Sequence, residues 1–204
     1  MKRDTPRQKT RKYELKARAE RQDETRQRIV DAAIALHTTI GPARTTVSAV
    51  AERAGVQRHT VYSHFPDDRA LGLACSGCHI ERHPLPDAAA WRTIAEPKAR
   101  LRRGFEEIYE YYEQNGAGLA PILRDADSDA VIREILDLRF RPVFESMRDA
   151  LAEPFHARGA RRTRLIATLD LFLDLQTWLV LARTATTAEA VEVAVRATCA
   201  QTQT

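Results

Sequence analysis

The stretch from Thr45 to Phe65, TTVSAVAERAGVQRHTVYSHF, constrains the fold more than any other part of the chain. Apolar residues recur at helical spacing on both sides of Gly55, and glycine suits the left-handed position just after a helix end. A threonine before the first of these segments can cap a helix, because its hydroxyl accepts from the free N–H groups of the first turn. The stretch therefore predicts two short helices joined by a tight turn, a helix-turn-helix.

The second helix of this motif carries the polar side chains that we expect to meet DNA. Arg58, His59, Tyr62 and Ser63 have spacings of one, four and five residues, which place them on one side of a helix. Arginine can donate to guanine edges, while tyrosine and serine can reach phosphates. The alternative is an ordinary helical hairpin whose polar face is only solvated. The expected DNA contacts are Arg44, Thr46, Gln57, Arg58, His59, Thr60, Tyr62, Ser63 and His64.

Residues 24–73 resemble the DNA-binding domain of the TetR-type transcriptional regulators. The resemblance rests on an A-A-x-x-L helix from Ala32, the Gly-x-x-x-Thr-Thr spacing from Gly41, an A-G-V turn and the signature T-V-Y-x-H-F. It implies a homodimeric repressor that binds a near-palindromic operator on double-stranded DNA and is released by a small-molecule effector. The chain departs from the family pattern at Gln57, at His59 and at Asp68, where a lysine that contacts phosphate is usual.

The composition favours an all-α chain. The 204 residues are 44% hydrophobic, enough to supply a core, and they are rich in Ala, Leu, Arg and Glu with few alternating β-branched runs. We expect an N-terminal helix-turn-helix domain followed by a helical regulatory and dimerisation domain. The predicted boundaries are 1–22 for a basic flexible arm, 23–73 for the DNA-binding domain, and 74–204 for the helical ligand-binding and dimerisation domain.

Basic charge is concentrated at the N-terminus. Residues 1–22 hold nine Lys or Arg against three acidic residues, a net charge of +6, so the rest of the chain carries −2 of the total +4. A basic arm beside a helix-turn-helix suits DNA, because neutralised phosphates release counterions, although a solvated tail is the alternative. Helix formers from Glu14 onward also allow the first helix to extend backward. Without an apolar signal or membrane segment, we expect a cytoplasmic protein with no membrane partner.

Helical periodicity predicts the remaining elements. A linker helix begins near the capping residue Asp67 and stops before His83, and in the resembled family this helix joins the two domains. Gly116 and Gly118 are expected to break the next helix, and Pro142 is expected to kink a later one. The expected helices after the linker helix are 97–114, a short segment to 125, one from Ser128 to Leu151, 160–183 and 189–199.

Aromatic and aliphatic side chains of the C-terminal part suggest a pocket and an interface. Phe105, Tyr109 and Tyr112 have the spacing of a core stripe, but together with Trp91 they also suit the wall of an apolar ligand pocket. Residues 160–183 are apolar around most of their circumference, so this helix needs two partners, of which one would be a second subunit. The residues assigned to that dimer interface are Leu165, Leu169, Phe172 and Leu179.

Cys75, Cys78, His79 and His83 lie on one face of the linker helix at offsets of three, four and eight. These are ligand types that zinc or copper prefers, so a metal- or redox-sensing regulator is the alternative function. A single helix supplies four tetrahedral ligands poorly, and cysteine is often a small buried residue, so packing is the favoured interpretation and no cofactor is expected. The sequence has no nucleophile elbow and no Gly-rich phosphate loop, so no catalytic residues are expected and the chain is not expected to be an enzyme.

Overall fold

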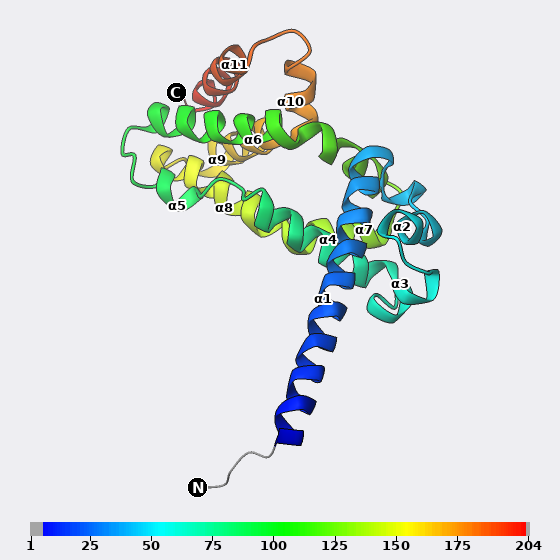
Figure 1. The fold of residues 1–204 in the computed structure, drawn as a ribbon. Coiled ribbons are helices and arrows are strands. Elements are labelled where there is room, and N and C mark those ends of the chain that lie inside the picture. Colours follow the sequence, from blue (N-terminus) through cyan, green and yellow to red (C-terminus); the bar gives the residue numbers. More distant parts are fainter. Residues whose placement is uncertain (1–5, 203–204) are drawn as a thin grey trace, which may run out of the picture.

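The computed structural model describes the backbone of residues 6–202 and the side chains of residues 16–202. This part of the chain is helical and contains no strand, which confirms the all-α prediction. Figure 1 shows a bundle of short helices beside one end of a larger helical body, with α1 projecting from the molecule. The helices are α1 Pro6–Ile40, α2 Val47–Ala54, α3 Arg58–His64, α4 Asp68–Arg82, α5 Ala88–Trp91, α6 Pro97–Ala126, α7 Ala130–Arg139, α8 Arg141–Ala152, α9 Gly159–Leu173, α10 Leu175–Leu181 and α11 Thr187–Ala200.

Two separate hydrophobic cores hold the chain together. The smaller core joins α1 to α4 around Ile29, Val50 and Phe65, which are at most 3% exposed. The larger core joins α5, α6 and α8 to α11 around residues such as Leu101 and Met147, which are fully buried. Each core excludes apolar surface from water by itself, so the chain consists of two parts that meet along α1, α4, α6 and α7: a helix-turn-helix unit, which we call the DNA-binding unit after the prediction above, and a body.

The helix-turn-helix has the local chemistry that the sequence predicts. The Thr46 hydroxyl accepts from the amide of Ala49 at the start of α2, and Gly55 ends that helix in the left-handed conformation at φ 66°. Asp67 caps α4 by accepting from the amide of Ala70. The structure therefore confirms all three predictions. Each of these features involves residues only a few positions apart, so the sequence alone was sufficient to predict it.

Helix α6 corrects the prediction of a break at residues 115–118, because it continues without interruption from Pro97 to Ala126. A Cβ on Gly116 would come within 3.1 Å of Leu175 and Trp178, and one on Gly118 would come within 3.3 Å of Thr38. These glycines therefore let other elements pack closely against an intact helix. Their role depends on tertiary contacts, which helix propensity does not describe.

Two further helices are divided where single helices were predicted. The chain leaves α9 at Asp174, which has extended backbone angles and caps α10 by accepting from the amide of Thr177. The chain also turns at Phe140 between α7 and α8, so Pro142 lies in the first turn of α8, where proline is tolerated, and does not kink a continuous helix.

Helix α1 begins at Pro6, so residues 6–22 of the predicted basic flexible arm are helical in this structure, residues 1–5 lie outside the described residues, and the flexibility of the arm stays a prediction. The backward extension that the helix formers from Glu14 allowed is therefore present, and it goes further than expected. The helix ends at Ile40, and Gly41 follows with φ 93°.

Candidate DNA interface and ligand cavity

Helix α3 presents a row of polar side chains to solvent. Arg58, His59 and Ser63 are exposed, and the Tyr62 ring is 47% exposed although it is large and aromatic. The opposite side of α3 packs inward through Val61, which is 1% exposed. The Ser63 hydroxyl donates to the Thr60 carbonyl, whereas within residues 16–202 the side chains of Arg58, His59 and Tyr62 have no hydrogen-bond partner. The row is thus free to bind an external partner.

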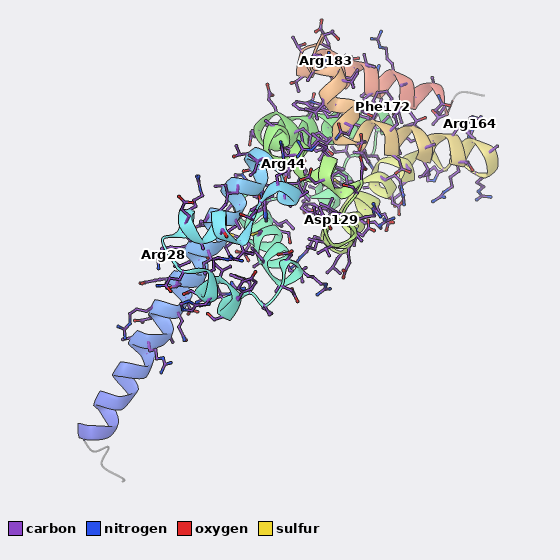
Figure 2. The ribbon with its side chains drawn as sticks, turned by 90° about the vertical axis from the view of Figure 1, so that its right-hand side faces the viewer. Arg28, Arg44, Asp129, Arg164, Phe172 and Arg183 are labelled. Atoms are coloured by element: carbon purple, nitrogen blue, oxygen red, sulfur yellow. The ribbon has the colours of Figure 1, made fainter. Side chains whose placement is uncertain are left out.

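The other residues predicted to contact DNA surround this row. Thr46, at the start of α2, and Gln57, just before α3, are exposed, while Thr60 and His64 are half-buried. Arg44 is exposed in the short helical turn before α2, and its Nε donates to the Ile40 carbonyl. Figure 2 shows Arg44 on the DNA-binding unit, whose helices are drawn in blue and cyan. The structure gathers these residues on one unit, but their contacts with DNA stay a prediction.

Helix α1 fixes the helix-turn-helix in place through charged side chains. Arg28 donates to the Ala54 carbonyl at the end of α2 over 3.2 Å, and the Arg26 guanidinium lies 4.8 Å from the centre of the Phe65 ring. On the other side, Arg82 of α4 makes a 2.7 Å ion pair with Asp31. Helix α1 therefore contacts the end of α2, the residue that follows α3, and α4.

The DNA-binding unit meets the body at a polar joint that the sequence did not reveal. The Asp125 carboxylate of α6 accepts from the Ala43 amide at 3.0 Å and from its neighbour Arg124, which also donates to the Ile40 carbonyl. Burial opposes ionisation of Asp125, but these hydrogen bonds outweigh it and hold the pKa of this carboxyl below its ordinary value. No local motif marks such a joint, because its partners lie more than 80 positions apart.

A cavity of about 290 Å³ lies in the body between α6, α7, α8, α9 and α10. Of the four predicted pocket residues, only Tyr112 lines it. Trp91, Phe105 and Tyr109 are at most 1% exposed and pack in the larger core, so their assignment to a pocket wall is corrected. The cavity is lined by Leu85, Tyr111, Tyr112, Leu119, Ile122, Leu123, Leu136, Phe140, Phe144, Asp170, Leu173, Asp174 and Leu175.

A second, smaller cavity of about 150 Å³ lies at the joint between the two units. Leu119 and Ile122 of α6, Leu136 of α7 and Phe140, which follows α7, line both cavities, so these side chains form a shared wall between them. His37 of α1 faces the smaller cavity, and its burial lowers the pKa, although Asp68 and Asp125 partly oppose that shift. The smaller cavity therefore lies between the body cavity and the helices α1, α2 and α4 of the DNA-binding unit.

Cys75, Cys78 and His79 of α4 have different neighbours, and this arrangement does not favour the alternative of a metal-sensing face. Cys75 is buried, with its Sγ 3.9 Å from the Val30 carbonyl, while the Cys78 sulfur accepts from Gln27 of α1. His79 lies on the other side, with Nε2 3.4 Å from the Tyr111 hydroxyl of α6. Within the described residues, no group of three or more His, Cys, Asp or Glu is placed to hold a metal ion.

We expect iodoacetamide at pH 8 to modify Cys78 and Cys199 while Cys75 stays unmodified in the folded protein. Burial raises the pKa of the Cys75 thiol to about 12, so below that pH the thiol keeps its proton and does not react as a thiolate. Mass spectrometry of tryptic peptides measures the three rates, and the same reaction in urea is the control in which all three should react. Modification of native Cys75 as fast as Cys78, or zinc that copurifies stoichiometrically, would contradict this assignment.

The assignment of Leu165, Leu169 and Phe172 to a dimer interface is also corrected. Leu165 and Leu169 are fully buried and Phe172 is 8% exposed, so all three belong to the core of their own chain, and only Leu179 of the predicted set is partly exposed. Figure 2 shows Phe172 within the body. The large apolar side chains that α9 and α10 do expose are Leu171, at 55%, and Val180, at 63%.

No helix in residues 6–202 combines the length and the apolar character that crossing a membrane would require.

Comparison with known proteins agrees with this architecture. Residues 29–75 match the family model of the bacterial regulatory proteins of the tetR family. The HTH-type transcriptional activator FasR of Mycolicibacterium smegmatis is 26% identical over 148 residues, which span 71% of this chain and 66% of that relative, slightly less than two thirds of its length. Because FasR is an activator, this match does not support the repressor expected from the sequence.

Two solved structures share the fold of nearly the whole chain. A tetR-family regulator from Streptomyces coelicolor superposes with a TM-score of 0.61 at 21% identity, covering 88% of this chain and 80% of that one. The regulator FadR from Bacillus subtilis, solved with stearoyl-CoA, gives 0.60 at 16% identity, covering 83% and 95%. These findings identify residues 29–75 as a helix-turn-helix domain of the tetR family, and they show that nearly the whole chain has the fold of tetR-family regulators.

Proposed function

We propose that the chain acts as a homodimer that binds a near-palindromic operator. An apolar effector that enters the body cavity changes the affinity of this dimer for the operator. The exposed row on α3, in which Arg58, His59 and Tyr62 have no hydrogen-bond partner within residues 16–202, supports the DNA-binding part of the proposal. Arg58 would reach base edges in the major groove, and Tyr62 would donate to a phosphate. Two copies of α3 related by a two-fold axis would read half-sites about 34–36 Å apart or a multiple of that distance.

The lining of the body cavity supports an effector with a long aliphatic or aromatic part. Leucine, isoleucine, phenylalanine and tyrosine side chains make up most of the wall, and Asp170 and Asp174 also line the cavity. Apolar pockets with a few polar groups are typical of small-molecule sites. The stearoyl-CoA bound by Bacillus subtilis FadR is a molecule of this kind and is a suitable first probe.

Contacts between α7 and α4 would connect a change in the body cavity to the DNA-binding unit. Leu136 and Phe140 line the cavity, and Ile135 of the same region packs so closely on α4 that a Cβ on Gly72 would come within 2.5 Å of it. Arg69 of α4 also makes a 2.7 Å ion pair with Glu134 of α7. An effector that displaces α7 therefore moves α4, and α4 changes the separation of the two recognition helices in the dimer.

Selection of duplexes from a random library by the purified protein tests the DNA-binding proposal. We expect enrichment of one sequence with two inverted half-sites, bound at least a thousandfold more tightly than random DNA of equal length at physiological salt. Failure to enrich any sequence, with the protein folded and dimeric, would count against it.

We expect Leu123→Trp to keep the operator affinity of the wild type but to weaken the response to stearoyl-CoA by about tenfold or more. Leu123 lines the body cavity and not the cavity at the joint, so the larger ring occupies effector space while the supports of α3 remain. The measurement is the stearoyl-CoA concentration that changes operator binding by half. Leu123→Met, which conserves volume, is the control and should respond like the wild type. An unchanged response in Leu123→Trp would place the effector elsewhere.

A further inference from the structure

The first 20 residues of α1, which we call the α1 extension and define as residues 6–25, project beyond the rest of the molecule. Figures 1 and 2 show this part of α1 leaving the DNA-binding unit on the side away from the body. Where side chains are described, the contacts of α1 with other elements begin at Arg26 and Arg28. Residues 16–24 are exposed, apart from the half-buried Ala17, so this segment has no packing partner in the described chain.

The α1 extension carries a net positive charge, which favours an anionic partner. Residues 6–25 contain seven Lys or Arg against three Glu and one Asp, and the first turn of α1 has no acidic residue. Positive charge near a helix N-terminus is repelled by the helix dipole, and a helix that is polar all round gains nothing from packing. A polyanion removes the repulsion and releases its own counterions, so the helical state of this segment is favoured when it lies against DNA.

The length of the α1 extension decides where on the DNA it acts. Twenty helical residues span about 30 Å, which equals the rise of about nine base pairs. The extension starts beside α3, because Arg26 lies over Phe65 at the end of that helix. A straight helix of this length reaches well past the groove that α3 would occupy.

We propose that the α1 extension is a second DNA-binding element, a rigid helix that contacts phosphates of the duplex flanking the half-site read by α3. This proposal rests on the proposed function, since it needs α3 to set the position of the protein on the DNA. It adds affinity from flanking DNA without reading its sequence. The helical form is essential, because a flexible tail with the same charges would bind the nearest phosphates and would not need long flanks.

The test measures affinity of the full-length protein for the selected operator carrying either 3 or 15 flanking base pairs on each side. We expect the wild type to bind the long duplex on the order of tenfold more tightly. Ala19→Pro should lose this gain although every charge remains, because proline breaks the helix, while Ala19→Ser at the same exposed position should keep it. Lys16→Gln, Arg18→Gln and Arg21→Gln together should lose the gain and reduce the salt slope by about three per protomer.

Two outcomes would overturn the proposal. Equal affinity of the wild type for short and long duplexes would show that flanking DNA is not contacted. A full gain in Ala19→Pro would show that the charges act as a flexible tail. The preference for operator over random DNA of equal length, measured on the short duplexes, tests the function of α3 separately, so failure of one proposal is distinguishable from failure of the other.

Discussion

Replacing Leu171 and Val180 together by glutamate is expected to separate the protomers while leaving each chain folded. These are the large apolar side chains that α9 and α10 expose, at 55% and 63%, so a two-fold interface on this segment would bury them. Two uncompensated carboxylates per protomer would then be desolvated, which strongly disfavours association. Because a dimer holds two half-sites at once, the monomer should lose operator affinity by about 10²- to 10⁴-fold.

Sedimentation velocity and DNA titration measure the two effects, and two single variants serve as controls. Leu138→Glu introduces the same charge at a side chain that is also 55% exposed but lies on α7, and it should remain dimeric. Phe172→Glu should unfold the protein, because this ring is 8% exposed and packs against Phe105 in the core. A Leu171→Glu/Val180→Glu protein that sediments as a dimer would move the interface away from α9 and α10.

The DNA-binding unit could be predicted from sequence because its signals are local. The Thr46 cap, the left-handed Gly55 and the Asp67 cap each involve residues at most a few positions apart, and all three occur in the structure. The alternation of Val61 inward with Arg58 and Tyr62 outward also follows from helical geometry alone. In this unit local propensity and tertiary packing agree, which is the condition under which pattern analysis succeeds.

The body was harder to predict because its residues act through distant contacts. Gly116 and Asp174 illustrate the difficulty. Gly116 lies inside a continuous helix, where Trp178 packs closely against it. Asp174 divides an apolar segment into two helices, because its side chain caps the second one. Face assignments fail for a related reason. A helix that is apolar on two sides does not reveal which side meets its own core, so Leu165 was assigned to an interface although it is fully buried.

Arg58→Ala is expected to lose operator affinity by about 1–3 kcal/mol, which is about five- to 150-fold, and to lose much less on random DNA. Arg58 begins α3, is exposed and has no partner within the described residues, so its guanidinium is free to donate to a guanine edge. Truncation at this site leaves the core of the unit intact, because Val61 and Phe65 supply the buried side of the helix. The operator preference should therefore fall while the melting temperature stays close to that of the wild type.

Tyr62→Phe provides the matched comparison, since Tyr62 lies one turn further along the same exposed face. Removing its hydroxyl would delete a phosphate contact, which positions the protein without choosing bases. Operator and random DNA should then weaken by a similar factor, so the ratio of the two affinities survives. Titrations of both variants on both DNAs at several salt concentrations distinguish these roles. If Arg58→Ala keeps the operator-to-random ratio of the wild type, then a different face of α3 enters the groove.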